Sequence, residues 1–424
     1  MRRLGCGMER QGRGVRVLLA FDSFKDTLAA EEVAALVEEA LRVHVPEDRL
    51  EVRVRHLSDG GEGFLQVFAQ SRRELELRSV RVTGPLCRVG ADGRTEAAQE
   101  VEAQYGIFLA SQTDASGAER KVRVGVAEMA QAAGLEQVPR RSRDPLLTTS
   151  RGVGELLAHL AGAEGCGRVI LGVGGSATSD GGLGMLPPLG VAVAVRGGVA
   201  GPAATLAGRD LCSLEGLPGP LGNALAGVEL QVACDVQNPF TGPAGAVHVF
   251  AAQKGADAAA RARLEEAMLR LEDCFASRGR MGPAFRGMPG CGAAGGVAGC
   301  LLSVAENASL QRGILVIDEA LQLSEAVEWA DVVFTGEGSY DAQTESGKVV
   351  SHVEQLCLNG GKRLVVLCGR TDRQLQAGGM HLCHDLASRF GAERSMAEAG
   401  ACLREILPEV CAAVPEFVAA AATE

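Results

Sequence analysis

The 424-residue sequence lacks any apolar run that approaches the ~20 residues needed to cross a bilayer. It also lacks a basic excess, because its formal net charge is −11 at pH 7. Nucleic acids and anionic membranes bind basic surfaces, so we expect neither as a partner. A small anionic substrate is still compatible with this charge, since a few local lysine and arginine side chains can override the overall field.

Cysteine is plentiful, at 13 residues, but the Cys-x-x-Cys spacing of zinc and redox motifs is absent. Most cysteines stand in apolar or helical surroundings, as in residues 232–234. Such cysteines are typical of small core side chains in a reducing compartment. One group of ligand-type residues occurs at 381–385, and we interpret it as the polar start of a helix rather than a metal site.

The sequence also lacks a signal peptide of the usual kind. Its first 14 residues are basic and glycine-rich but contain no apolar segment. We interpret residues 1–14 as a flexible extension, with a weak organelle-targeting signal as the alternative. Together with the cysteine pattern, this predicts a cytoplasmic protein.

Two successive strand–polar loop–helix units follow the extension. Strands are predicted at residues 15–21 and 51–57, each followed by a polar loop and a helix with an apolar stripe. This order is typical of a parallel sheet with ligand-binding loops at its carboxyl edge. The same style returns later in the chain, with strands predicted at 331–335 and 363–367.

The middle of the chain follows a different pattern. Short alternating segments from residue 75 to 126, broken by Gly, Pro and Asp, predict antiparallel hairpins. Further on, helices are predicted near 150–163 and 257–277, and buried strands at 168–173 and 229–234. The chain exceeds the size at which one hydrophobic core usually stops growing, so two α/β domains are expected. The simplest organisation is one domain made from both chain ends with a second inserted between them.

Four loops combine glycines with Asp, Glu or Ser after a predicted buried strand, as in residues 58–63, 174–182 and 336–341. Glycine lets the backbone approach a ligand and adopt positive φ, so that amide groups can bind an anion. The N-terminus of the following helix adds a partial positive charge. Carboxylates there would repel a phosphate unless Mg²⁺ lies between them or one of them acts as a base. The combination predicts a Mg-nucleotide or phosphoryl-transfer site.

Three similar patterns are rejected as misleading. Residues 347–348 do not form a Walker loop, because Val349 stands where Ser or Thr is required. Residues 290–295 match a dinucleotide-binding fingerprint, with Asp318 on a predicted strand about 20 residues later. No strand precedes the glycines, so we expect close helix packing instead of an NAD site. Residues 174–178 lack the closing glycine of a nucleophile elbow, which argues against a serine hydrolase.

Six motifs occur in one order along the chain, and this series closely resembles the type-1 glycerate kinase family. The likeness spans roughly residues 15–368. The motifs are FDSFK (21–25), SDGGEG (58–63), GVGGSATSDGGLG (172–184), ACDVQNPFTG (233–242), QKG (253–255) and TGEGSYDAQTESGK (335–348).

The resemblance implies a kinase without a Walker loop, which transfers the γ-phosphate of ATP to D-glycerate with Mg²⁺. It favours 2-phosphoglycerate over 3-phosphoglycerate as the product. It also implies a flavodoxin-like or Rossmann-like parallel-sheet domain of residues 15–78 and 287–424, split by an inserted mixed α/β domain of residues 79–286. The expected partners are therefore the small molecules D-glycerate and ATP, and a homodimer is an open alternative to a monomer.

Charged side chains within these motifs are assigned to catalysis and to the metal ion. Phosphoryl transfer depends on positioning and charge neutralisation. A base that accepts the proton of the hydroxyl group would be either Asp180 or Asp235, each at the end of a predicted strand. The expected catalytic residues are Lys25, Asp180, Asp235 and Lys254. The expected Mg²⁺ ligands are Asp59, Glu62, Glu337 and Asp341.

The remaining candidates are assigned to binding of a phosphate or the substrate carboxylate. The backbone of residues 174–176 is expected to contact an anion, which is either an ATP phosphate or the glycerate carboxylate. Pro239 fixes the turn after Asn238 and would hold that side chain rigid. The expected binding residues are Ser23, Gly174, Gly175, Ser176, Asn238, Gly336, Gly338 and Lys348.

The chain departs from the family pattern around its last motif. A basic residue is common at Ser339, a proline near Val350 and a glycine at His352. Two alternatives therefore accompany the glycerate kinase interpretation. One is a kinase for another small hydroxy acid or sugar acid, and the other is a non-catalytic paralogue that binds a nucleotide or an organic acid.

Overall fold

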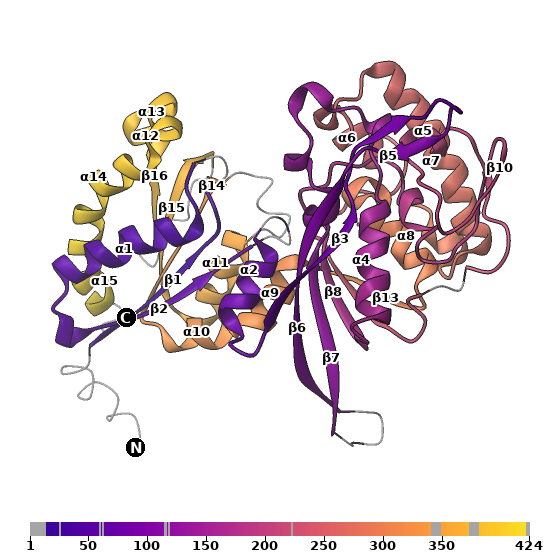
Figure 1. The fold of residues 1–424 in the computed structure, drawn as a ribbon. Coiled ribbons are helices and arrows are strands. Elements are labelled where there is room, and N and C mark those ends of the chain that lie inside the picture. Colours follow the sequence, from indigo (N-terminus) through magenta and orange to yellow (C-terminus); the bar gives the residue numbers. More distant parts are fainter. Residues whose placement is uncertain are drawn as a thin grey trace. The chain divides into compact units, whose positions relative to one another are not determined.

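The computed structural model describes residues 14–24, 27–58, 61, 63–113, 117, 119–221, 224–340, 349–372 and 381–420. The chain divides into two compact units (Figure 1). Unit 1 comprises Met1–Asp59 and Ile314–Glu424, and unit 2 comprises Gly60–Gly313. Among the described residues no helix is both long enough and apolar enough to span a membrane.

Unit 1 contains a five-stranded, all-parallel sheet in the order β16-β15-β14-β1-β2. Taken in chain order, these strands are arranged 2-1-3-4-5, which is the doubly wound order of flavodoxin-like folds. The predicted α/β class with a parallel sheet is therefore confirmed. The strands are β1 (Val15–Phe21), β2 (Leu50–His56), β14 (Val332–Tyr340), β15 (Arg363–Thr371) and β16 (His381–Asp385).

Helices cover both faces of this sheet, with α1 and α14 on one face and α10 and α11 on the other (Figure 1). Both faces are apolar, so adjacent β1 residues such as Leu18 and Leu19 are both fully buried. The described helices of unit 1 are α1 (Ala30–His44), α9 (Gly313–Leu321), α10 (Leu323–Trp329), α11 (Val349–Gly360), α12 (Leu386–Phe390), α13 (Ala392–Ala397), α14 (Ala399–Ala412) and α15 (Val414–Ala420).

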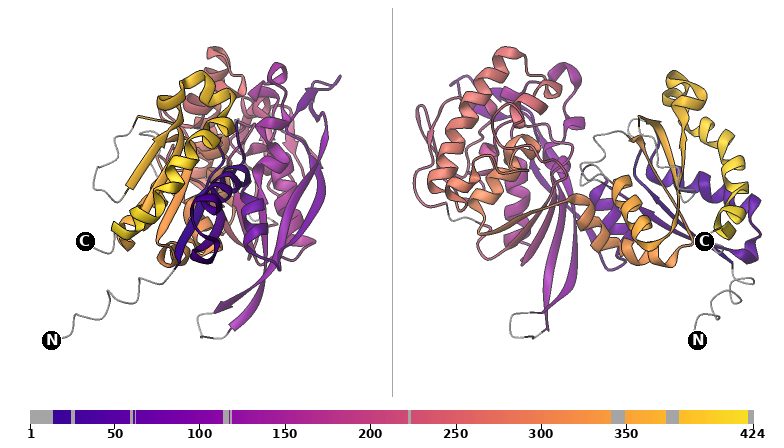
Figure 2. Two further views of the ribbon diagram at one scale, coloured as in Figure 1. Left: turned by 90° about the vertical axis from the view of Figure 1, so that its left-hand side faces the viewer. Right: turned by 180° about the vertical axis from the view of Figure 1, so that it is seen from behind.

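Unit 2 contains a six-stranded mixed sheet in the order β13-β12-β8-β7-β6-β3. The strands β3, β6 and β7 pair antiparallel, which confirms the hairpins expected between residues 75 and 126, and the other neighbours are parallel. The ends of β6 and β7 extend past the other strands (Figure 2). The strands are β3 (Glu76–Thr83), β6 (Glu100–Thr113), β7 (Glu119–Glu128), β8 (Arg168–Gly172), β12 (Glu229–Ala233) and β13 (Asn307–Gln311).

Helices and short strands complete unit 2. Three rings, those of Phe240, Phe275 and Phe285, meet edge to face in its core. The helices are α2 (Phe64–Ser71), α3 (Met129–Ala133), α4 (Arg151–Gly162), α5 (Gly208–Leu211), α6 (Ala246–Phe250), α7 (Ala258–Arg278) and α8 (Val297–Val304). The short strands are β4 (Cys87–Val89), β5 (Thr95–Ala97), β9 (Val193–Val195), β10 (Gly198–Ala200) and β11 (Leu214–Gly216).

The compact units divide the chain near residues 59 and 313, whereas the boundaries expected from the sequence lie at 78 and 286. Two contacts account for the difference. The N–H of Leu65 in α2 donates to the Glu128 carboxylate at the end of β7. The strand β13 pairs in parallel with β12 along its whole length. Both contacts join residues distant in sequence, so local patterns do not reveal them.

Glycines of the rejected dinucleotide fingerprint serve close packing, as expected. A Cβ atom on Gly292 would lie 2.2 Å from the Pro239 carbonyl oxygen, and one on Gly295 would lie 2.1 Å from that of Thr178. The segment leads into α8 without a preceding strand, and Asp318 lies in α9 rather than in a strand. This geometry gives no support to an NAD site.

Candidate functional site

The strands β1 and β14 of unit 1 are neighbours at the position where the strand order reverses. Phe21 is paired with Gly336, and the Asp22 N–H donates to the Gly336 carbonyl at 3.1 Å. The Asp22 carboxylate in turn accepts the Ser23 N–H at 2.7 Å. In open parallel sheets ligands bind outside the carboxyl ends of strands at such a reversal. The predicted Ser23 therefore begins a loop at a position suited to a ligand.

Gly336 and Gly338 lie inside a strand rather than in the loop that the sequence predicts. The strand β14 continues to Tyr340 beside β15. A Cβ atom on Gly336 would lie 2.0 Å from the Leu367 carbonyl oxygen, so glycine is required for the close approach of the two backbones. The expected phosphate contact of these glycines stays a prediction.

Five predicted site residues lie outside the described residues, and their roles stay predictions. Of the expected Mg²⁺ ligands, only Glu337 is described, as a buried carboxylate of β14. Within the described ranges no group of three or more His, Cys, Asp or Glu side chains is arranged to hold a metal ion. The five residues are Lys25, Asp59, Glu62, Asp341 and Lys348.

Three neighbouring parallel strands of unit 2 end in register, at Glu128 of β7, Gly172 of β8 and Ala233 of β12. The Val173 N–H donates to the Ala233 carbonyl at 3.3 Å, so the loops after β8 and β12 start side by side. These loops carry the predicted residues Gly174, Gly175, Ser176 and Asp235. The structure therefore brings this part of the predicted site together at one sheet edge.

The loop after β8 has two parts with different roles. Gly175 is exposed and has a φ of 68°, which glycine adopts without strain. Gly181 and Gly182 also have positive φ, but they are buried. A Cβ atom on Gly182 would lie 2.5 Å from the Cys300 Cβ, so this glycine is needed for packing against α8. In the first part, residues 174–176, Gly175 is exposed, Gly174 is half-buried and Ser176 is 9 % exposed, so a ligand would reach this part at Gly175.

Lys254 points into the protein beside the loop after β8. Its Nζ lies 2.8 Å from the Ser176 Oγ and 2.6 Å from the Thr178 carbonyl oxygen, and the side chain is 3 % exposed. Burial lowers the pKa of Lys254 to about 7, although the charge of Asp180 opposes the shift. Gly255 makes this inward turn feasible, because its φ is 98° and a Cβ would lie 2.1 Å from the Arg143 carbonyl oxygen.

Asp180 is fully buried, and its carboxylate is saturated by four hydrogen bonds. The N–H and Oγ–H of Ser150 donate to it at 2.8 and 2.7 Å, and the N–H groups of Gly182 and Gly184 at 3.1 and 3.2 Å. Burial raises the pKa of Asp180, and these hydrogen bonds oppose the shift. The geometry suits a group that positions the loop rather than one that meets a substrate.

Asp235 lies two residues after the end of β12 and is half-buried. The loop behind it is held by α7, because the Glu272 carboxylate accepts the Thr241 hydroxyl at 2.9 Å and the Glu265 carboxylate accepts the Gly242 N–H at 2.6 Å. The Asn238 side-chain amide donates to the Ala244 carbonyl at 2.7 Å, which closes the same loop. Asn238 thus acts on the shape of the loop in this structure.

Sequence reasoning missed two residues that organise this edge. Ser150 donates two hydrogen bonds to Asp180, and Glu128 accepts the N–H of Leu65 at the start of α2. Ser150 stands directly before α4, at the N-cap position. Serine is common there, so the sequence gives no sign of a second role for it. Glu128 ends a strand and had no motif around it. Only the sheet register reveals its position beside the loop after β8.

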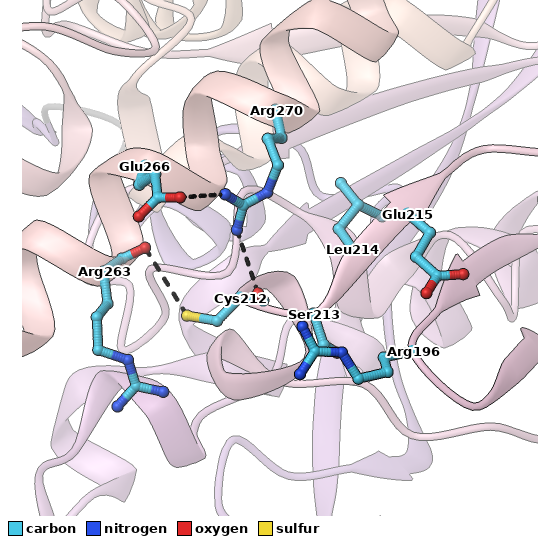
Figure 3. A pocket seen from close by; sticks show the side chains of 8 residues that line it. All are labelled: Arg196, Cys212, Ser213, Leu214, Glu215, Arg263, Glu266 and Arg270. Carbon is cyan, nitrogen blue, oxygen red and sulfur yellow. Dashed lines mark hydrogen bonds and ion pairs between the residues drawn. The ribbon is translucent and has the colours of Figure 1, made fainter.

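A surface pocket of about 320 Å³ lies elsewhere in unit 2 (Figure 3). Arg270 on α7 pairs with Glu266 at 2.7 Å and donates to the Cys212 carbonyl at 3.1 Å. None of its lining residues belongs to the six motifs, so the pocket does not mark the predicted site. The lining residues are Arg196, Cys212, Ser213, Leu214, Glu215, Arg263, Glu266 and Arg270.

The glycerate kinase family model matches residues 17–415. A protein named glycerate kinase from Bacillus subtilis (strain 168) is 35% identical over 374 residues, which cover 87% of this chain and 88% of that one. A protein named glycerate 2-kinase from Escherichia coli (strain K12) is 34% identical over 360 residues, which cover 84% and 85%.

A solved structure is similar along almost the whole chain. This crystal structure, which carries the name glycerate kinase 2 from Salmonella typhimurium LT2, has 33% identity and a TM-score of 0.71. The match covers 95% of this chain and 99% of that chain. The expected resemblance is therefore confirmed in sequence and in fold. The chain is a kinase and belongs to the glycerate kinase family.

Proposed function

We propose that the protein phosphorylates a hydroxyl group of D-glycerate with ATP and Mg²⁺, and that 2-phosphoglycerate is favoured over 3-phosphoglycerate. The observation that carries the proposal is the edge of unit 2 where Gly174, Gly175, Ser176 and Asp235 follow adjacent strands, with Lys254 behind them. Exposed glycine amides suit an anion, and a carboxylate suits a hydroxyl group. The name of the similar E. coli protein supports the choice of the 2-isomer.

ATP is assigned to the loops around the strand reversal of unit 1. Ser23 and the lysines Lys25 and Lys348 would contact phosphates, with Gly336 and Gly338 nearby. The Glu337 carboxylate is buried on β14. Carboxylate oxygens are hard donors, which suit Mg²⁺. Bound Mg²⁺ would neutralise charge on the phosphates. We assign the ion to Glu337 together with Asp59, Glu62 and Asp341.

Glycerate is assigned to the edge of unit 2. The backbone of residues 174–176 would bind its carboxylate, and Asp235 would orient the acceptor hydroxyl group. Asn238 would keep the loop that carries Asp235 in shape, through its hydrogen bond to the Ala244 carbonyl. Asp180 has no exposed surface, so we assign it to positioning of the loop.

A coupled assay tests the proposal. The full chain is supplied with Mg-ATP and D-glycerate, ADP release is followed, and the product isomer is identified with isomer-specific enzymes. We expect ADP and 2-phosphoglycerate in equal amounts. Faster turnover with tartronate or a longer sugar acid would instead favour the alternative substrate class, and binding without ADP release would favour a non-catalytic paralogue.

The departures from the family pattern give that last alternative little support. Val350 is fully buried in α11, and the His352 Nε2 forms a 2.7 Å hydrogen bond with the Asp318 carboxylate of α9. Both side chains therefore have a packing role that accounts for their presence.

We also propose a cytoplasmic location. The oligomeric state stays a prediction that size-exclusion chromatography would check.

A further inference from the structure

Ser176 and Lys254 form a hydrogen-bonded pair whose geometry suits proton transfer. The Lys254 Nζ has two oxygen neighbours, the Ser176 Oγ at 2.8 Å and the Thr178 carbonyl oxygen at 2.6 Å. A carbonyl oxygen can only accept, so one N–H must point to Thr178. A hydroxyl group can accept or donate, so the Ser176 O–H can donate to the lone pair of a neutral Lys254 amine.

The surroundings of Lys254 favour its neutral form. The side chain is 3 % exposed and forms no ion pair among the described residues. One charged group, Asp180, acts on Lys254, and another, Arg143, is hydrogen-bonded to the adjacent residue Gln253. Asp180 raises its pKa from a distance, and the guanidinium group of Arg143 donates to the Gln253 carbonyl at 3.4 Å. Burial outweighs Asp180 and lowers the pKa of Lys254 to about 7, so the amine titrates near neutral pH.

Ser176 is the member of the pair that a substrate can touch. It is 9 % exposed and follows Gly175, which is exposed at the edge of the sheet. Lys254 lies deeper and would act through the serine. A serine activated by a neighbouring lysine is an established chemical arrangement. Asp180 cannot take this role, because four donors already occupy its carboxylate.

We propose that Ser176 and Lys254 relay the proton of the acceptor hydroxyl group during phosphoryl transfer, an inference that rests on the proposed kinase function. The glycerate O–H bond breaks as its oxygen forms a bond to the γ-phosphorus, and the proton passes to the Ser176 Oγ. The Ser176 proton passes to the Lys254 Nζ, which becomes an ammonium group. The bond between the γ-phosphorus and the bridging oxygen breaks, and ADP leaves with that electron pair. Lys254 returns its proton to water after product release.

The relay predicts the direction of the pH dependence. A base must be neutral to accept a proton, so kcat should rise with pH through a value near 7 and then level off. If Lys254 served instead as a cation for a bound anion, kcat or kcat/KM would fall through the same range. The measurement is ADP release at saturating Mg-ATP and D-glycerate between about pH 5.5 and 9, a range that extends roughly two pH units to either side of the expected midpoint near 7.

Variants of the pair make the test specific. Ser176→Ala and Lys254→Met should each lower kcat by about 10²–10⁴-fold and lose the rise near pH 7. Ser179→Ala is the matched control, because its buried hydroxyl has no hydrogen-bond partner among the described residues. It should keep the wild-type profile, including any titration of the substrates themselves. Asp235→Asn should lower turnover but keep the rise near pH 7.

Lys254→Arg separates the relay from simple charge. Arginine stays protonated and cannot accept a proton, so the relay predicts a loss like that of Lys254→Met. An active Lys254→Arg enzyme, or a Ser176→Ala enzyme with wild-type turnover and pH profile, would overturn the relay. Ser176→Ala changes one small side chain, so its thermal midpoint should stay near that of the wild type. A wild-type chain that releases no ADP at any pH would overturn the kinase proposal itself.

Discussion

At the scale of single residues, Asp180 shows how a buried charge can be tolerated. Its carboxylate accepts four hydrogen bonds from the chain around it, and its neighbours Gly182 and Gly184 supply two of them. Hydrogen bonds to a charged acceptor contribute more to stability than neutral ones. Asp180 therefore fixes the shape of the loop that carries Ser176 and approaches Lys254.

Asp180→Asn tests this positioning role. The side-chain amide would place N–H donors against backbone N–H donors, so we expect the free energy of unfolding to fall by about 1.5–3 kcal/mol. Urea unfolding of the purified variant measures the loss. A variant with wild-type stability but no turnover would contradict the positioning role and restore Asp180 as a candidate base.

Gly182 illustrates a second requirement at this scale. Its φ is 78°, and a Cβ atom would lie 2.5 Å from the Cys300 Cβ. We expect Gly182→Ala to destabilise the protein by about 2–5 kcal/mol, the sum of backbone strain and overpacking. Gly190→Ala is the control, since Gly190 has a φ of 90° with open space around it, and it should cost only about 1–2 kcal/mol. Equal costs in thermal or urea unfolding would argue against the packing explanation.

At the scale of secondary-structure elements, a small polar cluster joins α9, α10 and α11. The Asp318 carboxylate of α9 accepts the Ser324 N–H and hydroxyl of α10 at 3.0 Å and lies 2.7 Å from His352 of α11. Burial alone would raise the pKa of Asp318, but the hydrogen bonds from His352 and Ser324 lower it overall. His352 stands where the family often has a glycine, and its contact with Asp318 joins α11 to α9.

His352→Ala should therefore destabilise unit 1 in a pH-dependent way. A carboxylate with a lowered pKa contributes stability above its unfolded value of about 3.9, and this stability is lost as the pH falls further. The difference in unfolding free energy between wild type and His352→Ala should be about 1–3 kcal/mol at pH 7 and should shrink below pH 4. Gln355→Ala, on the exposed side of α11, is the control. An unchanged difference at low pH would exclude the Asp318 pair as its source.

The elements also show what a sequence can and cannot predict. The strand β8 and the helices α4 and α7 were predicted within a residue or two, because their apolar periodicity is strong. The extension of β14 through Gly336 and Gly338 was missed, since glycines usually mark a loop. The close approach of the neighbouring β15 backbone explains Gly336. The interpretation of residues 381–385 as a helix start was wrong for most of the segment, because residues 381–385 form the edge strand β16. Only Asp385 caps a helix, by accepting the Ser388 N–H.

For the candidate site, the sequence predicted which residues take part but not which of them are in contact. Ordered motifs located Ser176, Asp235 and Lys254, because glycines and charges at strand ends are visible in one sequence. The pairing of Ser176 with Lys254 could not be predicted, since the two residues are 78 positions apart and their contact depends on the turn at Gly255. The saturation of Asp180 was hidden for the same reason, because Ser150 approaches it from another element.

At the scale of the whole molecule, the candidate residues are distributed over both compact units. Ser23 and Glu337 belong to unit 1, while Ser176, Asp235 and Lys254 belong to unit 2. Each unit has its own parallel strands, and the candidates follow the carboxyl ends of those strands or lie near them. A ligand that binds either set would bind only the folded form of the unit that carries it. Ligand binding should therefore be visible as a change in the stability of the full-length protein.

Removal of Mg²⁺ tests the proposed role of the carboxylates at this scale. With a bound ion, ATP at 100 times its Kd should stabilise the folded chain by about 2.7 kcal/mol, which appears as a rise in thermal midpoint. Without the ion, nothing would neutralise the repulsion between the phosphates, the Glu337 carboxylate and the net charge of −11. ATP with EDTA should therefore give a much smaller rise in thermal midpoint. AMP with and without Mg²⁺ is the control for binding through the base and ribose. Equal shifts for ATP with Mg²⁺ and with EDTA would contradict a metal ion held between carboxylates and phosphates, because the repulsion that the ion removes would then be absent.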